Sequence, residues 1–263
     1  MLKLDRLSRR YGSTVALGAV TLDVPAGQMV GVIGPAGAGK STLLRLMARM
    51  IDPSDGCLGW GDTILTPLAG RDLRAWRAAC AWVGPQPKLA DHLDVVSNVM
   101  MGRGADWPAW RAMTQIYTPR DRARALAALD RVGLAPIAAQ RAGGASLGQR
   151  RRIAIARALM HRPRVLVIDD AVTDLGRSDG LAVLAALRAT NRHDGTTIVC
   201  SLSQPDLARD ACDRILGLSG GRIVFDGAAP TLSAPMAQAL CETAVPAHRD
   251  PWAERAAPAL MSA

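Results

Sequence analysis

The sequence predicts an α/β fold with a mainly parallel sheet, preceded by an antiparallel β-rich segment and interrupted by an inserted helical subdomain. A short, continuously apolar run at residues 165–168 is typical of a strand buried on both faces, residues 29–33 predict a buried strand, and residues 197–200 predict a further strand. Helical patterns separate these runs, and strands that alternate with helices form parallel sheets. With 263 residues, 49% of them hydrophobic, the chain is long enough for one sizeable domain carrying a smaller subdomain.

The first 25 residues predict two antiparallel strands joined by a turn at residues 11–13, because apolar and polar side chains alternate on both sides of that turn. The strand at residues 29–33 follows, and a helix comes after it. That helix and its end are expected to bury four apolar side chains, Leu43, Leu46, Met47 and Met50. Short β segments between residues 56 and 65 and a helix over residues 73–79 complete this part.

Residues 88–162 are expected to be mostly helical and to form the inserted subdomain. Within it, residues 118–121 are a helix start signal, with a threonine cap, a proline at the first position and a carboxylate three residues on. That helix is expected to bury Ala125, Leu126, Leu129 and Val132, and the helix after residues 165–168 is expected to bury Leu181, Leu184 and Leu187. A hairpin is predicted around residues 219–221. Residues 1–244 are therefore predicted to form one domain, and residues 245–263, which lack periodicity, a loosely held tail.

Residues 34–41 match the GxxxxGK[ST] pattern of a loop that wraps nucleotide phosphates. Its glycines let successive backbone N–H groups converge on phosphate oxygens where a Cβ would obstruct them. Lys40 is expected to reach the β- and γ-phosphates, and Ser41 to offer its hydroxyl to Mg²⁺. The flanking strand and helix make a chance match the weaker interpretation. The predicted nucleotide site comprises Gly34, Pro35, Ala36, Gly37, Ala38, Gly39, Lys40, Ser41 and Thr42.

Asp169 follows the apolar run at residues 165–168. A buried strand that ends in an acid, well downstream of a phosphate loop, supplies the Mg²⁺ carboxylate in enzymes of this kind. The sequence therefore predicts that Asp169 and Ser41 share a magnesium ion.

Charge and composition narrow the classes of partner. The net charge of +9 is compatible with nucleic acid or an anionic membrane surface, but aromatic residues make up only 3% of the chain, so no base-stacking platform is expected. Dedicated nucleic-acid binding is therefore not predicted. The arginines at residues 150–152 are compatible with a plain solvated helix face. No apolar run of about 18 residues occurs, and the N-terminus lacks a signal-peptide core, which favours a soluble cytoplasmic protein. The five cysteines contain no CxxC pair and are expected to be free and mostly buried.

Residues 145–159 open a helix with a small polar turn and read Ala-Ser-Leu-Gly-Gln followed by three arginines and IAIARAL. This segment resembles the signature of ABC-transporter ATPases, LSGGQ followed by QRxxIARAL, and the resemblance covers residues 2–232. It implies a P-loop NTPase fold of the ABC type, with ATP and Mg²⁺ as ligands. It also implies a head-to-tail dimer in which Ser146, Gly148 and Gln149 of one subunit face the ATP that the other subunit holds.

The same resemblance assigns further site residues. It places Tyr11 against the adenine ring, Gln86 on Mg²⁺ and Asp169 in the position of the magnesium aspartate. Two alternatives stay open, because Tyr11 is compatible with an ordinary aromatic at a strand end, and Gln86 with an ordinary loop amide.

Four residues depart from the pattern of the family. Asp170 stands in place of the general-base glutamate and is one methylene shorter, and a misplacement of about 1 Å can cost about two orders of magnitude in rate. Ser203 stands in place of the histidine that contacts the γ-phosphate. Leu147 replaces a signature glycine, and Gly176 replaces the aspartate of the loop that links the subunits. These departures leave normal, slow or nearly absent hydrolysis open, with Asp170, Ser203 and Gln86 as the candidate catalytic residues.

Within the family, several stretches are similar to the ATPase of phosphonate importers: residues 99–103, 132–142, 201–208 and 224–227. The resemblance implies a peripheral subunit on the cytoplasmic face of the inner membrane, two membrane-spanning permease subunits docked near residues 86–115, and a periplasmic substrate-binding protein. The cargo could be a phosphonate, phosphate, phosphite or another small oxyanion, and the dimer could be homomeric or mixed. The alternative function is a catalytically deficient regulatory or structural subunit paired with a competent ATPase.

Overall fold

Two sheets organise the part of the chain that the structure, a computed structural model, describes, namely residues 1–106 and 117–242. The larger sheet has the order β10-β9-β3-β8-β7-β6, in which β9, β3, β8, β7 and β6 are parallel and β10 pairs antiparallel with β9. The smaller sheet, β2-β1-β4-β5, is antiparallel. The strands are β1 (Leu2–Tyr11), β2 (Thr14–Val24), β3 (Met29–Ile33), β4 (Asp55–Trp60), β5 (Thr63–Ile64), β6 (Cys80–Val83), β7 (Val165–Ile168), β8 (Thr197–Ser201), β9 (Arg214–Ser219) and β10 (Arg222–Ala228). The predicted mainly parallel sheet with an antiparallel β-subdomain is confirmed.

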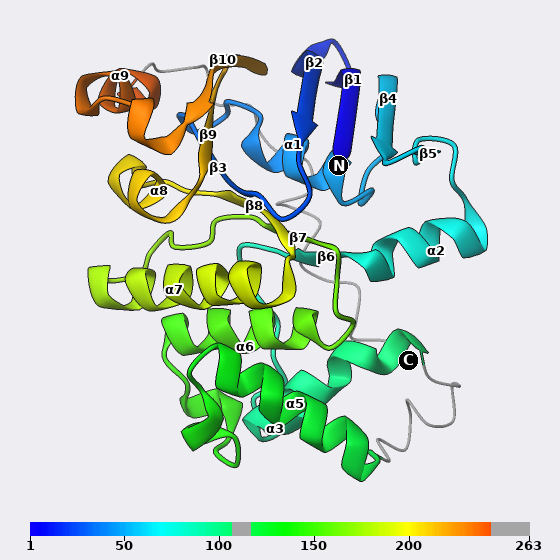
Figure 1. Cartoon of the computed structure of the whole chain (residues 1–263), viewed down its shortest axis with the longest axis vertical. Coiled ribbons are helices and arrows are strands. Elements are labelled where there is room, and N and C mark those ends of the chain that lie inside the picture. The colour runs from blue at the N-terminus through cyan, green and yellow to red at the C-terminus, as the bar shows by residue number, and fades with distance from the viewer. Residues whose placement is uncertain (107–116, 243–263) are drawn as a thin grey trace.

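Helices cover the larger sheet and form the inserted subdomain. Their bounds are α1 (Lys40–Met47), α2 (Gly70–Ala79), α3 (Val95–Met100), α5 (Pro119–Arg131), α6 (Leu147–Leu159), α7 (Arg177–Asp194), α8 (Pro205–Ala211) and α9 (Ala234–Glu242). Short 3₁₀ segments lie at η1 (Met101–Asp106), η2 (Ala135–Ile137), η3 (Ala142–Gly144) and η4 (Ala229–Thr231). In Figure 1, α3, α5 and α6 gather at one end of the molecule, and β1, β2 and β4 lie at the other. α3, α5 and α6 pack against one another, as expected of the inserted subdomain.

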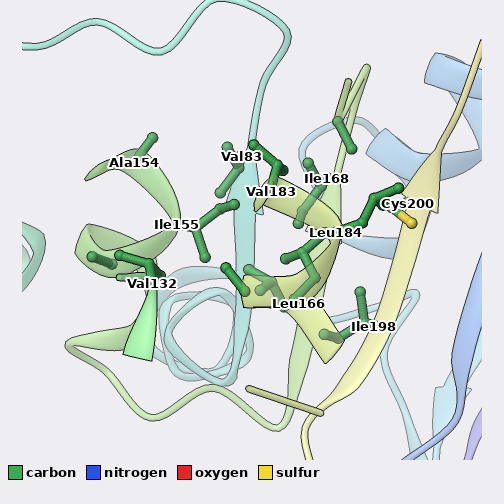
Figure 2. Packing of buried hydrophobic residues seen from close by; sticks show 14 of the residues in the cluster. Val83, Val132, Ala154, Ile155, Leu166, Ile168, Val183, Leu184, Ile198 and Cys200 are labelled. Atoms are coloured by element: carbon green, nitrogen blue, oxygen red, sulfur yellow. The ribbon is translucent and has the colours of Figure 1, made fainter. Parts of the chain in front are cut away.

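The main core lies between the larger sheet and the helices α6 and α7. Figure 2 shows Leu166, Ile168 and Ile198 of β7 and β8 together with Leu184 of α7 and Ile155 of α6. All residues of β3, β7 and β8 are buried, which confirms the burial predicted for residues 29–33 and 165–168. A second cluster joins the antiparallel sheet to α1 and to the opposite face of the larger sheet. The phosphate loop therefore lies between two packed layers.

Three predicted core residues are exposed: Met50, Leu126 and Leu181. Met50 lies beyond the end of α1, and Arg49 before it has a left-handed backbone (φ 53°), so the helical spacing no longer applies there. α5 buries Ala128 instead of Leu126, and α7 buries Gly180 instead of Leu181, so that both leucines are exposed. The other members of these predicted faces are buried, including Leu129 and Leu184.

The helix start predicted at residues 118–121 is confirmed by a capping box, in which Thr118 and Asp121 satisfy each other's backbone N–H groups. The hairpin predicted around residues 219–221 is also confirmed. α9 was not predicted. The predicted tail at residues 245–263 and part of the predicted docking segment, residues 107–115, lie outside the described residues.

None of the helices within residues 1–106 and 117–242 has the length and apolar character needed to cross a membrane. All five cysteines are free, and Cys80, Cys200 and Cys212 are buried, as expected. Cys57 is exposed, and Cys241 is half-buried.

Candidate nucleotide site

The phosphate loop runs from the end of β3 to the start of α1 and passes close to two other strands. Gly34 and Gly39 have φ values of 144° and 100°, which residues with a Cβ rarely adopt. A Cβ at Gly34 would overlap the carbonyl oxygen of Leu218 at the end of β9, and one at Gly39 would overlap the carbonyl oxygen of Ala16 in β2. The loop therefore needs glycine at both positions, for space as well as for backbone conformation.

Lys40 folds back over its own loop. Its Nζ donates hydrogen bonds to the carbonyl oxygens of Gly34 (2.6 Å) and Pro35 (2.9 Å). Burial lowers the pKa of the Lys40 ammonium, while Asp170, Cys241 and Asp169 act in the opposite direction. The ammonium group thus occupies the mouth of the loop, where a phosphate would displace two neutral carbonyl oxygens as its partners.

Ser41 and Asp169 meet as predicted. The Ser41 hydroxyl donates to Asp169 Oδ1 at 3.0 Å, and the Ser201 hydroxyl donates to the same oxygen at 2.9 Å. Asp169 is 1% exposed. Burial raises the pKa of its carboxyl group, and the hydroxyls of Ser41 and Ser201 partly offset that rise.

The oxygen atoms of Ser41 and Asp169 fit a magnesium ion. Mg²⁺ prefers hard oxygen ligands and is commonly held by one or two carboxylates together with substrate phosphates. Residues 1–106 and 117–242 contain no cluster of three or more His, Cys, Asp or Glu side chains suited to a metal. Ser201 was missed by the sequence analysis, although its position as the last residue of β8, next to β7, would have pointed to it.

The Asp170 carboxylate lies in a short chain of hydroxyl groups. The Thr173 hydroxyl is 3.2 Å from Asp170 Oδ1 and 3.2 Å from Ser203 Oγ. The backbone N–H of Asp170 donates to Ser201 Oγ at 2.7 Å, and Asp170 has a left-handed backbone with φ 54°. The structure therefore brings the two predicted catalytic residues Asp170 and Ser203 together through Thr173, which sequence reasoning did not identify.

The signature segment begins α6. Ser146 caps the helix: the Gln149 N–H donates to Ser146 Oγ (3.2 Å), and the Ser146 N–H donates to Gln149 Oε1 (2.8 Å). Gly148 is buried against α7, where a Cβ would collide with the Asp179 side chain, whereas the neighbouring Leu147 is exposed. Ser146 and Gln149 thus bond to each other within the first turn of α6, and Gly148 packs on α7, so the role of these residues toward a second subunit's ATP stays a prediction.

The family model described as ABC transporter matches residues 17–173 of this chain. The chain belongs to the ABC transporter family. A Phosphonates import ATP-binding protein PhnC from Rhodopseudomonas palustris (strain BisB5) is 45% identical over 240 residues, which cover 91% of this chain and 89% of the relative. A protein of the same description from Bradyrhizobium diazoefficiens is 42% identical over 240 residues, with the same coverage.

Solved ABC cassettes share the fold. A dimeric ATP-binding cassette in a post-hydrolysis state, bound to ADP and Pi, is 26% identical with a TM-score of 0.75, covering 87% of this chain and 99% of that one. These similarities confirm the predicted ABC-type P-loop fold, and they identify the chain as an ATP-binding transport ATPase. They favour this function over the alternative of a catalytically deficient regulatory subunit.

Two further residues that the family resemblance assigns to the site, Tyr11 and Gln86, lie in surroundings that do not by themselves indicate their roles. Tyr11 is half-buried, its hydroxyl has no hydrogen-bond partner within the described residues, and the Arg9 guanidinium lies 4.8 Å from its ring centroid. Gln86 is exposed and lines a cavity of about 530 Å³ together with Trp82, Met101 and Arg157. Among the described residues, the hydrogen-bond partners of Ser41 and Asp169 do not include Gln86, so its role as a magnesium ligand stays a prediction.

Proposed function

We propose that this chain is the ATP-hydrolysing subunit of an importer for phosphonates or a related small oxyanion. The observation that carries the proposal is the 3.0 Å hydrogen bond between Ser41 and Asp169, which joins the phosphate loop to the acid at the end of β7. It occurs in a chain that is 45% identical, over 91% of its length, to a Phosphonates import ATP-binding protein.

The phosphate loop and Lys40 capture the nucleotide. Backbone N–H groups of residues 34–42 and the N-terminus of α1 attract the phosphate oxygens. Lys40 exchanges the carbonyl oxygens of Gly34 and Pro35 for the β- and γ-phosphates. Tyr11 offers its ring to the adenine base. Ser41 and Asp169, with Gln86, hold Mg²⁺, which when bound neutralises the charge that develops on the phosphates.

Asp170 is the general base that accepts a proton from the attacking water, and Ser203 lies beside it to contact the γ-phosphate. Thr173 bridges the two at 3.2 Å on either side, which limits the rotation of the Asp170 carboxylate. Because the hydroxyl groups of Ser203 and Thr173 are neutral, they supply less charge stabilisation than a histidine would. We therefore expect hydrolysis that is slow but coupled to transport.

The chain works as a head-to-tail dimer with itself or with a second ATPase subunit. Ser146, Gly148 and Gln149 at the start of α6 face the ATP that the partner holds, and closure of the dimer completes both sites. Two membrane-spanning permease subunits dock near residues 86–115 on the cytoplasmic face of the membrane, where the 530 Å³ cavity beside Gln86 offers a recess. A periplasmic substrate-binding protein delivers the oxyanion.

The test has two stages. Calorimetry of the purified chain with Mg·ATP, beside Lys40→Ala, measures nucleotide capture. The chain is then reconstituted in proteoliposomes with a phosphonate-importer permease and its substrate-binding protein, and phosphate release and uptake are measured with methylphosphonate, phosphate and phosphite as separate cargoes. The proposal expects Mg·ATP binding and uptake of methylphosphonate that depends on ATP. Binding without phosphate release would instead support the regulatory subunit, and uptake of phosphate alone would correct the cargo.

A further inference from the structure

Arg151 joins the signature helix to the loop that carries Asp170. It lies on α6, five residues after Ser146, and its side chain turns inward so that the residue is only 4% exposed. Its Nη1 donates to the carbonyl oxygen of Asp170, and its Nη2 donates to the carbonyl oxygen of Thr173 at 3.3 Å. The run of three arginines is therefore not a solvated face, because its middle member is buried against the catalytic loop.

These two bonds fall on a strained segment. Asp170 has φ 54°, a conformation that is costly for a residue with a Cβ and that persists only where the surroundings enforce it. Ser201 Oγ accepts the N–H of Asp170 at 2.7 Å, and Arg151 binds its carbonyl group on the other side. The backbone of Asp170 is thus fixed at both of its peptide groups, and one of the two contacts comes from α6.

A buried guanidinium is itself costly, which argues against an incidental contact. Burial lowers the pKa of Arg151, and the nearby carboxylates of Asp170, Asp174 and Asp169 oppose that effect. The planar fork of arginine can reach two carbonyl oxygens at once, whereas the single ammonium of lysine cannot reproduce that geometry. Gly148 packs on Asp179 of α7 in addition, so the start of α6 is held against the segment after β7 at a second point.

We propose that Arg151 is a positioning residue that holds the Asp170 backbone and couples the signature end of α6 to the hydrolytic carboxylate. The inference rests on the proposed function, in which Ser146 faces the partner's ATP and Asp170 acts on this chain's own ATP. Ser146 and Arg151 are separated by about 7.5 Å along the helix, from the rise of about 1.5 Å per residue. A nucleotide bound by the partner therefore steadies Asp170 in this chain through α6, and the two ATP sites hydrolyse cooperatively.

The kinetic test compares Arg151→Gln and Arg151→Lys with the parent. The matched control is Arg150→Gln, on the same helix, whose side chain instead pairs with Asp91 and the Ala142 carbonyl oxygen. We expect Arg151→Gln to lower kcat by about 10- to 100-fold, as misplacement of a catalytic group by about 1 Å can do. KM and the calorimetric Kd for Mg·ATP should stay within about twofold, since the phosphate loop is untouched. The Hill coefficient for ATP should fall toward one, Arg151→Lys should recover part of kcat, and Arg150→Gln should match the parent.

A double-mutant cycle separates positioning from a general structural role. If Arg151 acts through Asp170, Arg151→Gln should add nothing to the residual rate of Asp170→Asn, because effects of residues that act as a unit are not additive. The proposal would be overturned if Arg151→Gln lowered kcat by the same factor in the parent and in Asp170→Asn. A fall in Mg·ATP affinity parallel to the fall in kcat would overturn it as well.

Amide hydrogen exchange in the nucleotide-free protein provides a readout that does not depend on hydrolysis. Arg151→Gln should speed exchange in a peptide covering residues 169–175 while leaving peptides of β3 and β8 unchanged, and Arg150→Gln should leave all of them unchanged. If the parent does not hydrolyse ATP, the proposed function fails, and this measurement still decides whether Arg151 holds the loop. Unchanged exchange at residues 169–175 would overturn the inference.

Discussion

Ser41 and Asp169 lie 128 residues apart in the sequence, and their side-chain oxygen atoms are 3.0 Å apart in the fold. The contact depends on the parallel pairing of the larger sheet, in which β8 lies between β3 and β7 and aligns Ser201 with Val32, near the end of each strand. The carboxyl ends of these strands therefore lie next to the start of α1, where Ser41 is located. The Ser41–Asp169 contact thus joins the phosphate loop and the acid after β7 into one site.

Replacing Lys40 with alanine should abolish detectable binding of Mg·ATP by calorimetry, with a loss of at least about 100-fold in affinity. The side chain supplies a cation at the start of α1, and in the nucleotide-free protein it donates hydrogen bonds to the carbonyl oxygens of Gly34 and Pro35, which phosphate oxygens would replace. Lys3→Ala removes an exposed lysine of β1, in the smaller sheet, and serves as the control. Retained nanomolar or micromolar binding in Lys40→Ala would contradict the assignment.

Replacing Gly34 with alanine should destabilise the fold by about 2 kcal/mol or more, because the change combines a strained backbone with an overlap against Leu218. Chemical denaturation of the nucleotide-free protein measures the free energy of unfolding, and Mg·ATP affinity should fall in the same variant. Gly144→Ala is the matched control, since a Cβ there meets open space and the backbone is not left-handed. Equal stability of the two variants would show that the loop can relax around Gly34.

The double variant Asp170→Glu with Ser203→His should raise ATP turnover about 10-fold or more. A longer carboxylate reaches further toward the attacking water, and a histidine adds a charge-stabilising contact to the γ-phosphate. Steady-state phosphate release at saturating Mg·ATP measures the effect, with Ser203→Thr as a control that keeps the hydroxyl. Turnover no faster than that of the parent would mean that these two positions do not limit the rate.

Asp169→Asn should stabilise the nucleotide-free protein at neutral pH while preventing hydrolysis. Burial raises the pKa of the Asp169 carboxyl group in the folded state, so the folded protein favours the protonated form. Its contribution to stability is fully present below the unfolded-state pKa and is lost as the pH rises through the folded-state value. The advantage of the asparagine variant in thermal unfolding should therefore be largest at neutral pH and shrink as the pH falls through that window.

Asp213 serves as a control, because its pKa in the folded protein is shifted in the opposite direction to that of Asp169. The Arg188 guanidinium, 2.6 Å away, holds the pKa of the Asp213 carboxyl group below its usual range. Its contribution to stability is present above the unfolded-state pKa and is lost as the pH falls through the folded-state value. Asp213→Asn should therefore lower the unfolding midpoint at neutral pH, by an amount that shrinks on acidification. The same sign for both variants would contradict the assigned environments.

Features that depend on neighbours within a few residues could be predicted from the sequence. The buried strands β3, β7 and β8, the capping box at Thr118, the turn between β9 and β10 and the phosphate loop all follow from local backbone chemistry or side-chain periodicity. The resemblance to ABC-transporter ATPases rested on motifs of this kind, and the family comparison confirmed it.

Other features were decided only by the tertiary structure, because they depend on which elements pack together. Strand register sets Ser201 beside Asp169, and the packing of α6 on the loop after β7 buries Arg151, which local charge patterning placed on a solvated face. Helical spacing predicted apolar faces for α5 and α7, yet Leu126 and Leu181 are exposed, because the elements packed on each helix cover Ala128 and Gly180 instead. The sequence by itself thus determined the nucleotide-binding motif and the α/β alternation, which local interactions encode. The tertiary structure alone decided which hydroxyls and which arginine surround Asp169 and Asp170, because those contacts join segments that are far apart along the chain.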